Sequence, residues 1–208
     1  MKRWFLLVIG VAWYMSLMVV AQAGGDATVG VRLFNDTQWS AAQRFFEDFT
    51  QEHPTDPVGA FYLGRTFFEQ EQYEPAIEWL ERAALLDTRN SNYHLWLGRA
   101  YGYQAQRASV LWQFPLALRV KKHFEQAVKL DPDNVDARAD LMEYYLKAPR
   151  IIGGGKGKAE AQAHEISRRN LQEGLRAWRM IAEEEAKVYV QTHPPLDSTN
   201  TSAVPTRK

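Results

Sequence analysis

A pattern that recurs every 34 residues constrains this sequence more than any other feature. Leu63-Gly64 returns as Leu97-Gly98, and in both copies an aromatic residue follows three positions after the glycine. One period earlier the same position is Gly30. Glycine inside a helix costs about 1 kcal/mol relative to alanine, so a glycine repeated at one phase predicts close approach of a second helix that a Cβ would prevent.

Each glycine-containing segment is followed by a second helical pattern. The apolar residues of these second segments recur at intervals of four and then three positions: Ala42, Phe46 and Phe49; Ala76, Leu80 and Ala83; Val120, Phe124 and Ala127. This spacing is typical of one face of an amphipathic helix. Asp56-Pro57 and the segment 131–134 supply turn and capping residues between helices. The chain is therefore expected to form helix pairs that bury their faces by stacking.

The period, the Leu-Gly-x-x-Tyr segments and the Ala-x-x-x-Phe segments resemble the tetratricopeptide repeat (TPR) family over about residues 24–170. The resemblance implies an all-α fold, a right-handed TPR superhelix of antiparallel helix pairs with a C-terminal capping helix. Within residues 24–190 we expect repeats at about 24–56, 57–90, 91–134 and 135–170, and a capping helix at 171–190. Individual helices are expected at 26–35, 38–52, 57–70, 73–86 and 134–147, and from Lys156 onward.

Two parts of this repeat pattern depart from regularity. In the third repeat 19 residues separate the two helical patterns, against nine in the second, which predicts an insert at about residues 103–114. Trp112 and Phe114 in this insert either pack beneath it, the arrangement we prefer, or form an exposed apolar patch for a partner. The insert and the Ile-Ile-Gly-Gly-Gly segment at 151–155 resemble a group of exported bacterial TPR proteins.

The capping helix and the two chain ends have their own patterns. In the capping helix the expected buried stripe is Leu171, Leu175, Trp178, Ala182, Ala186 and Tyr189. Residues 1–23 have the layout of a secretory signal, so we expect cleavage after Ala23 and export to the periplasm or the exterior. The alternative is an anchor formed by residues 4–20, and only then would the chain contact a membrane. Residues 191–208 are expected to be a disordered tail.

Composition and motifs argue against a catalytic site, a metal site and a nucleic-acid-binding role. Lys and Arg number 25, Asp and Glu also number 25, and Cys is absent, which argues against a nucleic-acid binder, a disulfide framework and a thiolate zinc site. No two of the five histidines have helical metal-ligand spacing. The segment 153–158 lacks the first glycine and the hydroxyl of a phosphate-binding loop, so we interpret it as a flexible loop. We therefore predict no catalytic residue, no metal site and no cofactor.

Arg65 and Arg99 lie 34 residues apart, at the same position of successive repeats. In TPR arrays this phase of the first helix faces the concave groove, so the resemblance implies a clamp for an acidic peptide or a C-terminal carboxylate. The remaining members of this peptide-binding stripe are Phe61, Asn92, Leu95 and Tyr103. The competing interpretation is that each arginine pairs with an acid inside the array, such as Glu69 or Asp140, and binds nothing.

Three hypotheses about function follow. The first is a non-enzymatic exported scaffold that binds a peptide or protein partner in its concave groove. The second is an enzyme or a small-ligand-binding protein with a site between the 103–114 insert and the 153–157 glycine loop. The third is a membrane-tethered structural subunit of an envelope complex, which requires that the N-terminal segment stays uncleaved.

Overall fold

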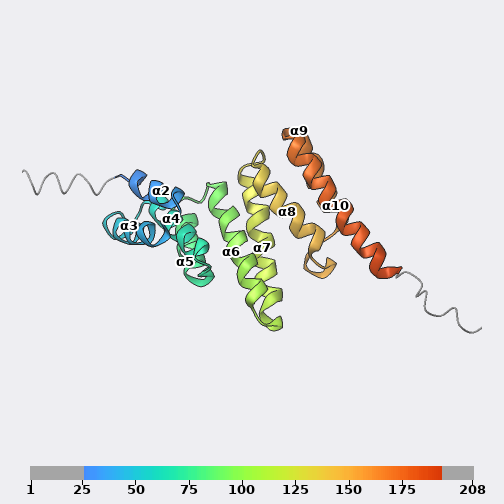
Figure 1. Ribbon diagram of the computed structural model, residues 1–208, viewed down its shortest axis with the longest axis horizontal. Coiled ribbons are helices and arrows are strands. Elements are labelled where there is room, and N and C mark those ends of the chain that lie inside the picture. The colour runs from blue at the N-terminus through green and yellow to red at the C-terminus, as the bar shows by residue number, and fades with distance from the viewer. Residues whose placement is uncertain (1–25, 194–208) are drawn as a thin grey trace, which may run out of the picture. The chain divides into compact units, whose positions relative to one another are not determined.

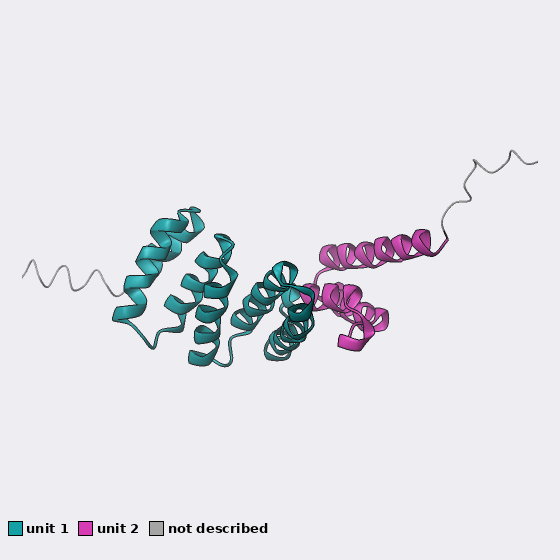
Figure 2. Ribbon diagram, turned by 90° about the horizontal axis from the view of Figure 1, so that it is seen from below, with its two compact units in different colours: residues 1–137 teal, residues 138–208 magenta. Residues whose placement is uncertain are grey.

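A computed structural model describes residues 26–193, which form nine α-helices and one short 3-10 helix (Figure 1). The expected signal at residues 1–23 and the tail from residue 194 onward lie outside the described residues. Residues 191 and 192, which were expected in the tail, belong to the last helix. No helix between residues 26 and 193 is long and apolar enough to cross a membrane. The chain divides into two compact units, of which unit 1 ends at Ala137 and unit 2 begins at Arg138 (Figure 2).

Unit 1 contains three helical hairpins. They are α2 (Thr28–Asn35) with α3 (Trp39–Glu52), α4 (Pro57–Glu69) with α5 (Tyr73–Leu86), and α6 (Ser91–Arg107) with α7 (Val110–Leu130). The helices of the first two hairpins begin and end within two residues of the expected positions. The Asp56 side chain caps α4 by accepting a hydrogen bond from the Val58 amide at 2.7 Å, directly before Pro57 in the first helical position.

At each repeated glycine the second helix of the hairpin leaves no room for a Cβ. A Cβ on Gly64 would lie 2.8 Å from the Leu80 side chain and 3.0 Å from its backbone nitrogen. On Gly98 it would lie 2.3 Å from the Phe124 ring, and Gly30 faces aromatic rings of α3 at the same distance. The predicted close approach of paired helices is confirmed at all three positions.

The core of unit 1 lies between these paired helices. Its fully buried large side chains include Phe46, Leu63, Leu80, Leu95 and Leu97. Among the aromatic side chains, Phe46, Phe67 and Phe124 are buried, and Phe45 and Trp79 are partly buried at the edge of the core. Removing such side chains from water contributes roughly 25 cal/mol per Å² of apolar area, which stabilises the stacked hairpins.

The third hairpin differs from the expectation. No insert separates its helices, because only Ala108 and Ser109 lie between α6 and α7. The extra residues lengthen both helices to 17 and 21 residues, against 13 and 14 in α4 and α5. Trp112 and Phe114 are 67% and 48% exposed, so the prediction that they pack beneath an insert is wrong. Fewer helices surround these extended ends, so less of their apolar surface is buried.

Unit 2 contains α8 (Val135–Lys147), which begins just before the unit boundary, η1 (Arg150–Ile152), α9 (Lys156–Arg169) and α10 (Leu171–Thr192). The connection between α8 and α9 is a packed turn, which corrects the expectation of a flexible loop. The Tyr144 hydroxyl donates to the Ile152 carbonyl at 2.9 Å, and a Cβ on Gly154 would lie 1.8 Å from a carbonyl oxygen. Gly153 has a φ of 95°, a left-handed conformation that favours glycine.

The buried face of α10 is also different from the predicted stripe. Its buried residues are Gly174, Ala177 and Ile181, which face α9. A Cβ on Gly174 would lie 2.3 Å from Ser167 Oγ, so small residues set the contact between the two helices. The large residues of the expected stripe are mostly on the exposed side: Leu171 at 69%, Leu175 at 58% and Tyr189 at 63%. The predicted stripe was wrong because α9 packs closely against the face of α10 that carries the small residues Gly174 and Ala177.

Candidate functional site

Arg65, in α4, is held among aromatic rings. Its guanidinium carbon lies 3.5 Å from the centroid of Trp96, and the rings of Phe34 and Phe61 follow at 4.7 and 5.9 Å. One turn further along α4, Glu69 accepts a hydrogen bond from Arg65 at 3.5 Å. Burial lowers the pKa of Arg65, and the Glu69 carboxylate opposes that shift. Arg65 is therefore positioned by cation–π contacts as well as by the ion pair.

Arg99, in α6, brings a second guanidinium to the same indole. Its guanidinium carbon lies 4.7 Å from the centroid of Trp96. The charge of Arg99 acts in the same direction as burial and lowers the pKa of Arg65 further. Two like charges from successive repeats therefore meet at one ring, a combination that favours an anionic ligand. The ion pair of Arg65 with Glu69 is one of the internal pairings that the competing interpretation named.

The other residues of the predicted binding stripe differ in accessibility. Asn92 is exposed and Tyr103 is 47% exposed, so both can contact a partner. Phe61 is half-buried, and its ring packs on Tyr93 at a centroid distance of 4.8 Å. Leu95 is 2% exposed, because its aliphatic side chain packs in the core between helices. The inclusion of Leu95 among the peptide-binding residues was therefore wrong.

A pair of histidines that the sequence did not connect lies between α6 and α7. His94 Nδ1 and His123 Nδ1 are 3.1 Å apart, so in the neutral pair one ring donates and the other accepts. The His123 ring stacks on those of His94 and Tyr101 at 5.4 and 5.6 Å. Burial lowers the pKa of both histidines, that of His123 to about 4, and the charge of Lys122 acts in the same direction.

Tyr101 links this stack to two charged groups. Its hydroxyl donates to Glu81 Oε1 at 2.5 Å and accepts from Arg119 Nη1 at 2.8 Å. Burial raises the pKa of Tyr101 to about 12, and the hydrogen bond to Glu81 contributes in the same direction. With a pKa this high, the hydroxyl is a poor general acid or base near neutral pH, so the arrangement suits a structural role.

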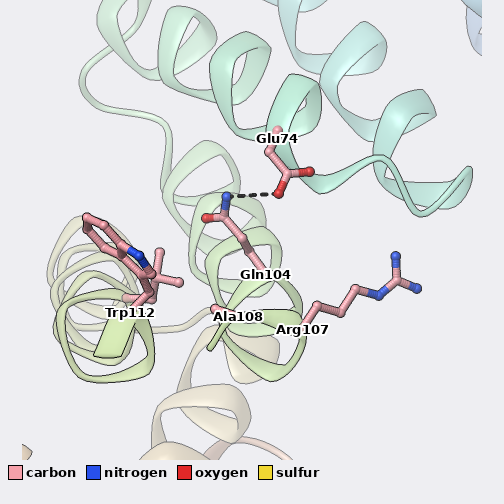
Figure 3. Close-up of a pocket in the computed structure, with 6 residues that line it drawn as sticks. Glu74, Gln104, Arg107, Ala108 and Trp112 are labelled. Atoms are coloured by element: carbon pink, nitrogen blue, oxygen red, sulfur yellow. Dashed lines mark hydrogen bonds between the residues drawn. The ribbon is translucent and has the colours of Figure 1, made fainter. Parts of the chain in front are cut away.

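An open pocket of about 340 Å³ lies where α5, α6 and α7 meet (Figure 3). Its lining residues are Glu74, Gln104, Arg107, Ala108, Trp112 and Leu116. Gln104 Nε2 donates to Glu74 Oε1 at 3.3 Å across the pocket. Arg107 points away from both and binds the Glu71 carboxylate at 2.5 Å. The polar groups of the pocket are thus bonded to other protein groups, and the Trp112 indole supplies an apolar wall.

The described part of the chain brings no group of metal-ligating side chains together. Between residues 26 and 193 no three His, Asp or Glu side chains lie close enough to hold a metal ion together. The enzyme hypothesis combined the segments 103–114 and 153–157. The first of them is helical apart from its two-residue turn.

No protein-family model and no curated protein matches this sequence. Solved structures match its fold. The thermophilic TPR protein TTC0263 of Thermus thermophilus is 19% identical, with a TM-score of 0.58 over 79% of this chain and 93% of that chain. The first TPR of Spaghetti (RPAP3), bound to the HSP90 peptide SRMEEVD, is 17% identical, with a TM-score of 0.50 over 56% of this chain and 85% of that chain.

An O-GlcNAc transferase mutant of Thermobaculum terrenum is 21% identical, with a TM-score of 0.55 over 67% of this chain and 24% of that chain. At identities below 25% these likenesses concern the fold. They agree with the 34-residue period and with the glycine-mediated pairing of helices. The chain therefore has the all-α helical-repeat fold of TPR proteins.

Proposed function

We propose that this chain is an exported, non-enzymatic scaffold that binds a peptide or protein carboxylate at the surface formed by Arg65, Trp96 and Arg99. The observation that carries the proposal is the placement of two guanidinium groups from successive repeats at one indole ring, 3.5 and 4.7 Å from its centroid. A carboxylate bound there would relieve the repulsion between the two cations. The peptide-bound TPR neighbour supports a peptide as the partner.

The chemistry of the two arginines fits a carboxylate. A guanidinium presents a flat set of N–H donors that binds a carboxylate through two parallel hydrogen bonds. Arg65 is held mainly by rings, and its Nε has no hydrogen-bond partner among the described residues. The exposed Asn92 and Tyr103 lie on the same helix as Arg99 and can contact neighbouring parts of a peptide. Guanidinium groups, aromatic rings and an amide bind; none of them is a nucleophile.

The binding proposal is tested with a defined acidic peptide. The probe is SRMEEVD with a free C-terminus, and its amidated form tests the role of the terminal carboxylate. We expect Arg99→Lys to weaken binding of the free-acid peptide at least tenfold in calorimetry, because lysine cannot make the bidentate contact. Arg82→Lys is the matched control, since Arg82 also lies over a tryptophan, at 5.1 Å from the Trp79 ring, but on α5.

Two outcomes would contradict the carboxylate site. One is equal affinity of the free-acid and amidated peptides, and the other is unchanged affinity in Arg99→Lys. Arg65→Lys is expected to weaken binding as well, but also to lower the melting temperature, because Arg65 is 19% exposed and contacts three rings. A loss of stability without a loss of affinity in that variant would assign Arg65 to the scaffold.

Export is the second part of the proposal, and it is supported by the layout of residues 1–23. We expect the mature chain to begin at Gly24. The intact mass of the protein isolated from its native cell measures this directly. A mass that retains residues 1–23 would favour the membrane-tethered subunit instead.

A further inference from the structure

The first half of α7 carries a concentration of exposed apolar side chains. Five large apolar residues within nine positions are between 41% and 86% exposed: Val110, Leu111, Trp112, Phe114 and Leu118. At the angular spacing of an α-helix, all of them except Trp112 fall in one stripe about 100° wide. We call these five residues the α7 apolar tip.

The tip lies at the end of the longest hairpin of unit 1. Because α6 and α7 have 17 and 21 residues against 13 and 14 in α4 and α5, they reach about 6 and 10 Å further along their axes. The turn at residues 108–109 lies below the other helices of unit 1 in the view of Figure 1. The apolar residues therefore sit on a protruding helix end.

Basic residues follow the apolar residues along α7. Residues 108–124 contain three Lys and Arg residues and no Asp or Glu: Arg119, Lys121 and Lys122. At the end of α6, Arg107 pairs with Glu71. Along the outward stripe of α7 the exposed residues change from apolar, ending at Leu118, to charged, beginning at Lys122 one turn later. An apolar end backed by basic residues is the pattern of segments that enter the interface of an anionic membrane.

We propose that the α7 apolar tip inserts into the headgroup region of an anionic phospholipid membrane, with Lys121 and Lys122 at the lipid phosphates. The basic residues that follow the tip favour an anionic lipid surface over a second protein surface. This contact is independent of an anchor at residues 4–20 and of the carboxylate site.

The absence of cysteine in the chain makes a local test possible. Leu111→Cys carries an environment-sensitive fluorophore on the full-length chain, and Leu85→Cys, at a position 78% exposed on α5, carries the same label as the control. The probes are vesicles of phosphatidylglycerol with phosphatidylcholine, and vesicles of phosphatidylcholine alone. We expect a blue shift and at least threefold less quenching by iodide at position 111 on the anionic vesicles, and neither change at position 85.

A companion variant tests whether the tip itself drives insertion. Phe114→Glu in the labelled Leu111→Cys chain is expected to abolish the blue shift while circular dichroism stays unchanged, because Phe114 is 48% exposed. The proposal is overturned if position 111 stays in water on anionic vesicles, or if it responds equally on the neutral ones. A blue shift that grows with protein concentration in the absence of vesicles overturns it in favour of a second copy of the chain.

Discussion

The hairpins α4–α5 and α6–α7 share one packing pattern and differ in what extends beyond it. The first helix of each contains Leu-Gly-Arg at the same phase, and in both the glycine lets the second helix approach closely. The helices of α4–α5 have 13 and 14 residues, whereas those of α6–α7 have 17 and 21. The repeat pattern thus determines where the two helices of a hairpin pack against each other. It does not determine how long they are. The added length supplies surface that the regular hairpin lacks.

The two hairpins also differ in how polar their interiors are. The places that His94 and His123 occupy in α6–α7 correspond to Ala60 and Trp79 in α4–α5. Similarly, Tyr101 corresponds to Phe67. The longer hairpin therefore contains titratable, hydrogen-bonded groups where the shorter one packs apolar side chains. We therefore expect pH to change the stability of α6–α7 more than that of α4–α5.

The largest effect is expected from Gly64→Leu in the shorter hairpin. A Cβ there would meet the backbone nitrogen of Leu80 at 3.0 Å and the Ala76 carbonyl at 3.1 Å, and backbone cannot rotate away. We expect a loss of about 3 kcal/mol or more in urea unfolding. Gly98→Leu should cost less if the Phe124 ring can turn aside. A Gly64→Leu melting temperature within about two degrees of the parent would refute the close-packing argument.

Acid should weaken the longer hairpin selectively. Because the pKa of His123 is lowered from 6.5 to about 4, its contribution is complete above pH 6.5 and is lost as the pH falls toward 4. With allowance for partial exposure we expect a loss of about 2 kcal/mol over that range. Unfolding curves at neutral pH and near the lowered pKa measure it, and His123→Gln should be less sensitive to pH. Equal slopes in the two proteins would show that other groups are responsible.

Tyr101→Phe should have a smaller effect. The substitution converts the position to its α4–α5 counterpart, so the ring fits and only the hydroxyl is lost. Glu81 and Arg119 are 46% and 58% exposed and can bond to water instead, so we expect a loss of about 1 kcal/mol. Chemical unfolding at neutral pH measures it. Unchanged stability would mean that the hydroxyl network contributes nothing.

The smallest change is expected to be stabilising. Gly102, in α6, faces open space, since the atom nearest to an added Cβ would be Val120 Cγ2 at 4.0 Å. Gly102→Ala should therefore raise stability by about 0.5–1 kcal/mol through helix propensity. Thermal melts compared with those of Gly64→Ala provide the contrast. Destabilisation by Gly102→Ala would show that α6 needs this glycine for another reason.

The hairpin bases could be predicted from sequence because their constraints are local and periodic. Gly64 and Gly98 mark the contacts between helices, and Asp56 before Pro57 marks a helix start. Helix length was harder to predict. The spacing between the two patterns of the third repeat counts extra residues without saying whether they are helical. Pro115 lies inside α7, near its start. An exposed helix end tolerates this proline, because the carbonyl it leaves free can bond to water.

The candidate site was only partly accessible from sequence. The phase of Arg65 and Arg99 followed from the repeat, but the part played by Trp96 did not, because it depends on which rings stack between neighbouring hairpins. The pairing of His94 with His123 joins two helices across 29 positions, and no spacing rule connects them. Contacts of this kind follow from the packing of the hairpins.

The aromatic setting of Arg65 has a consequence for the entropy of recognition. An arginine side chain that becomes fixed only on binding loses rotamer freedom equivalent to about 1.5–2 kcal/mol. The rings of Phe34 and Trp96 and the Glu69 carboxylate fix Arg65 in the free protein, so this loss falls on folding. A ligand that reaches this guanidinium meets a donor already in place, and less of its binding free energy is spent on ordering the protein.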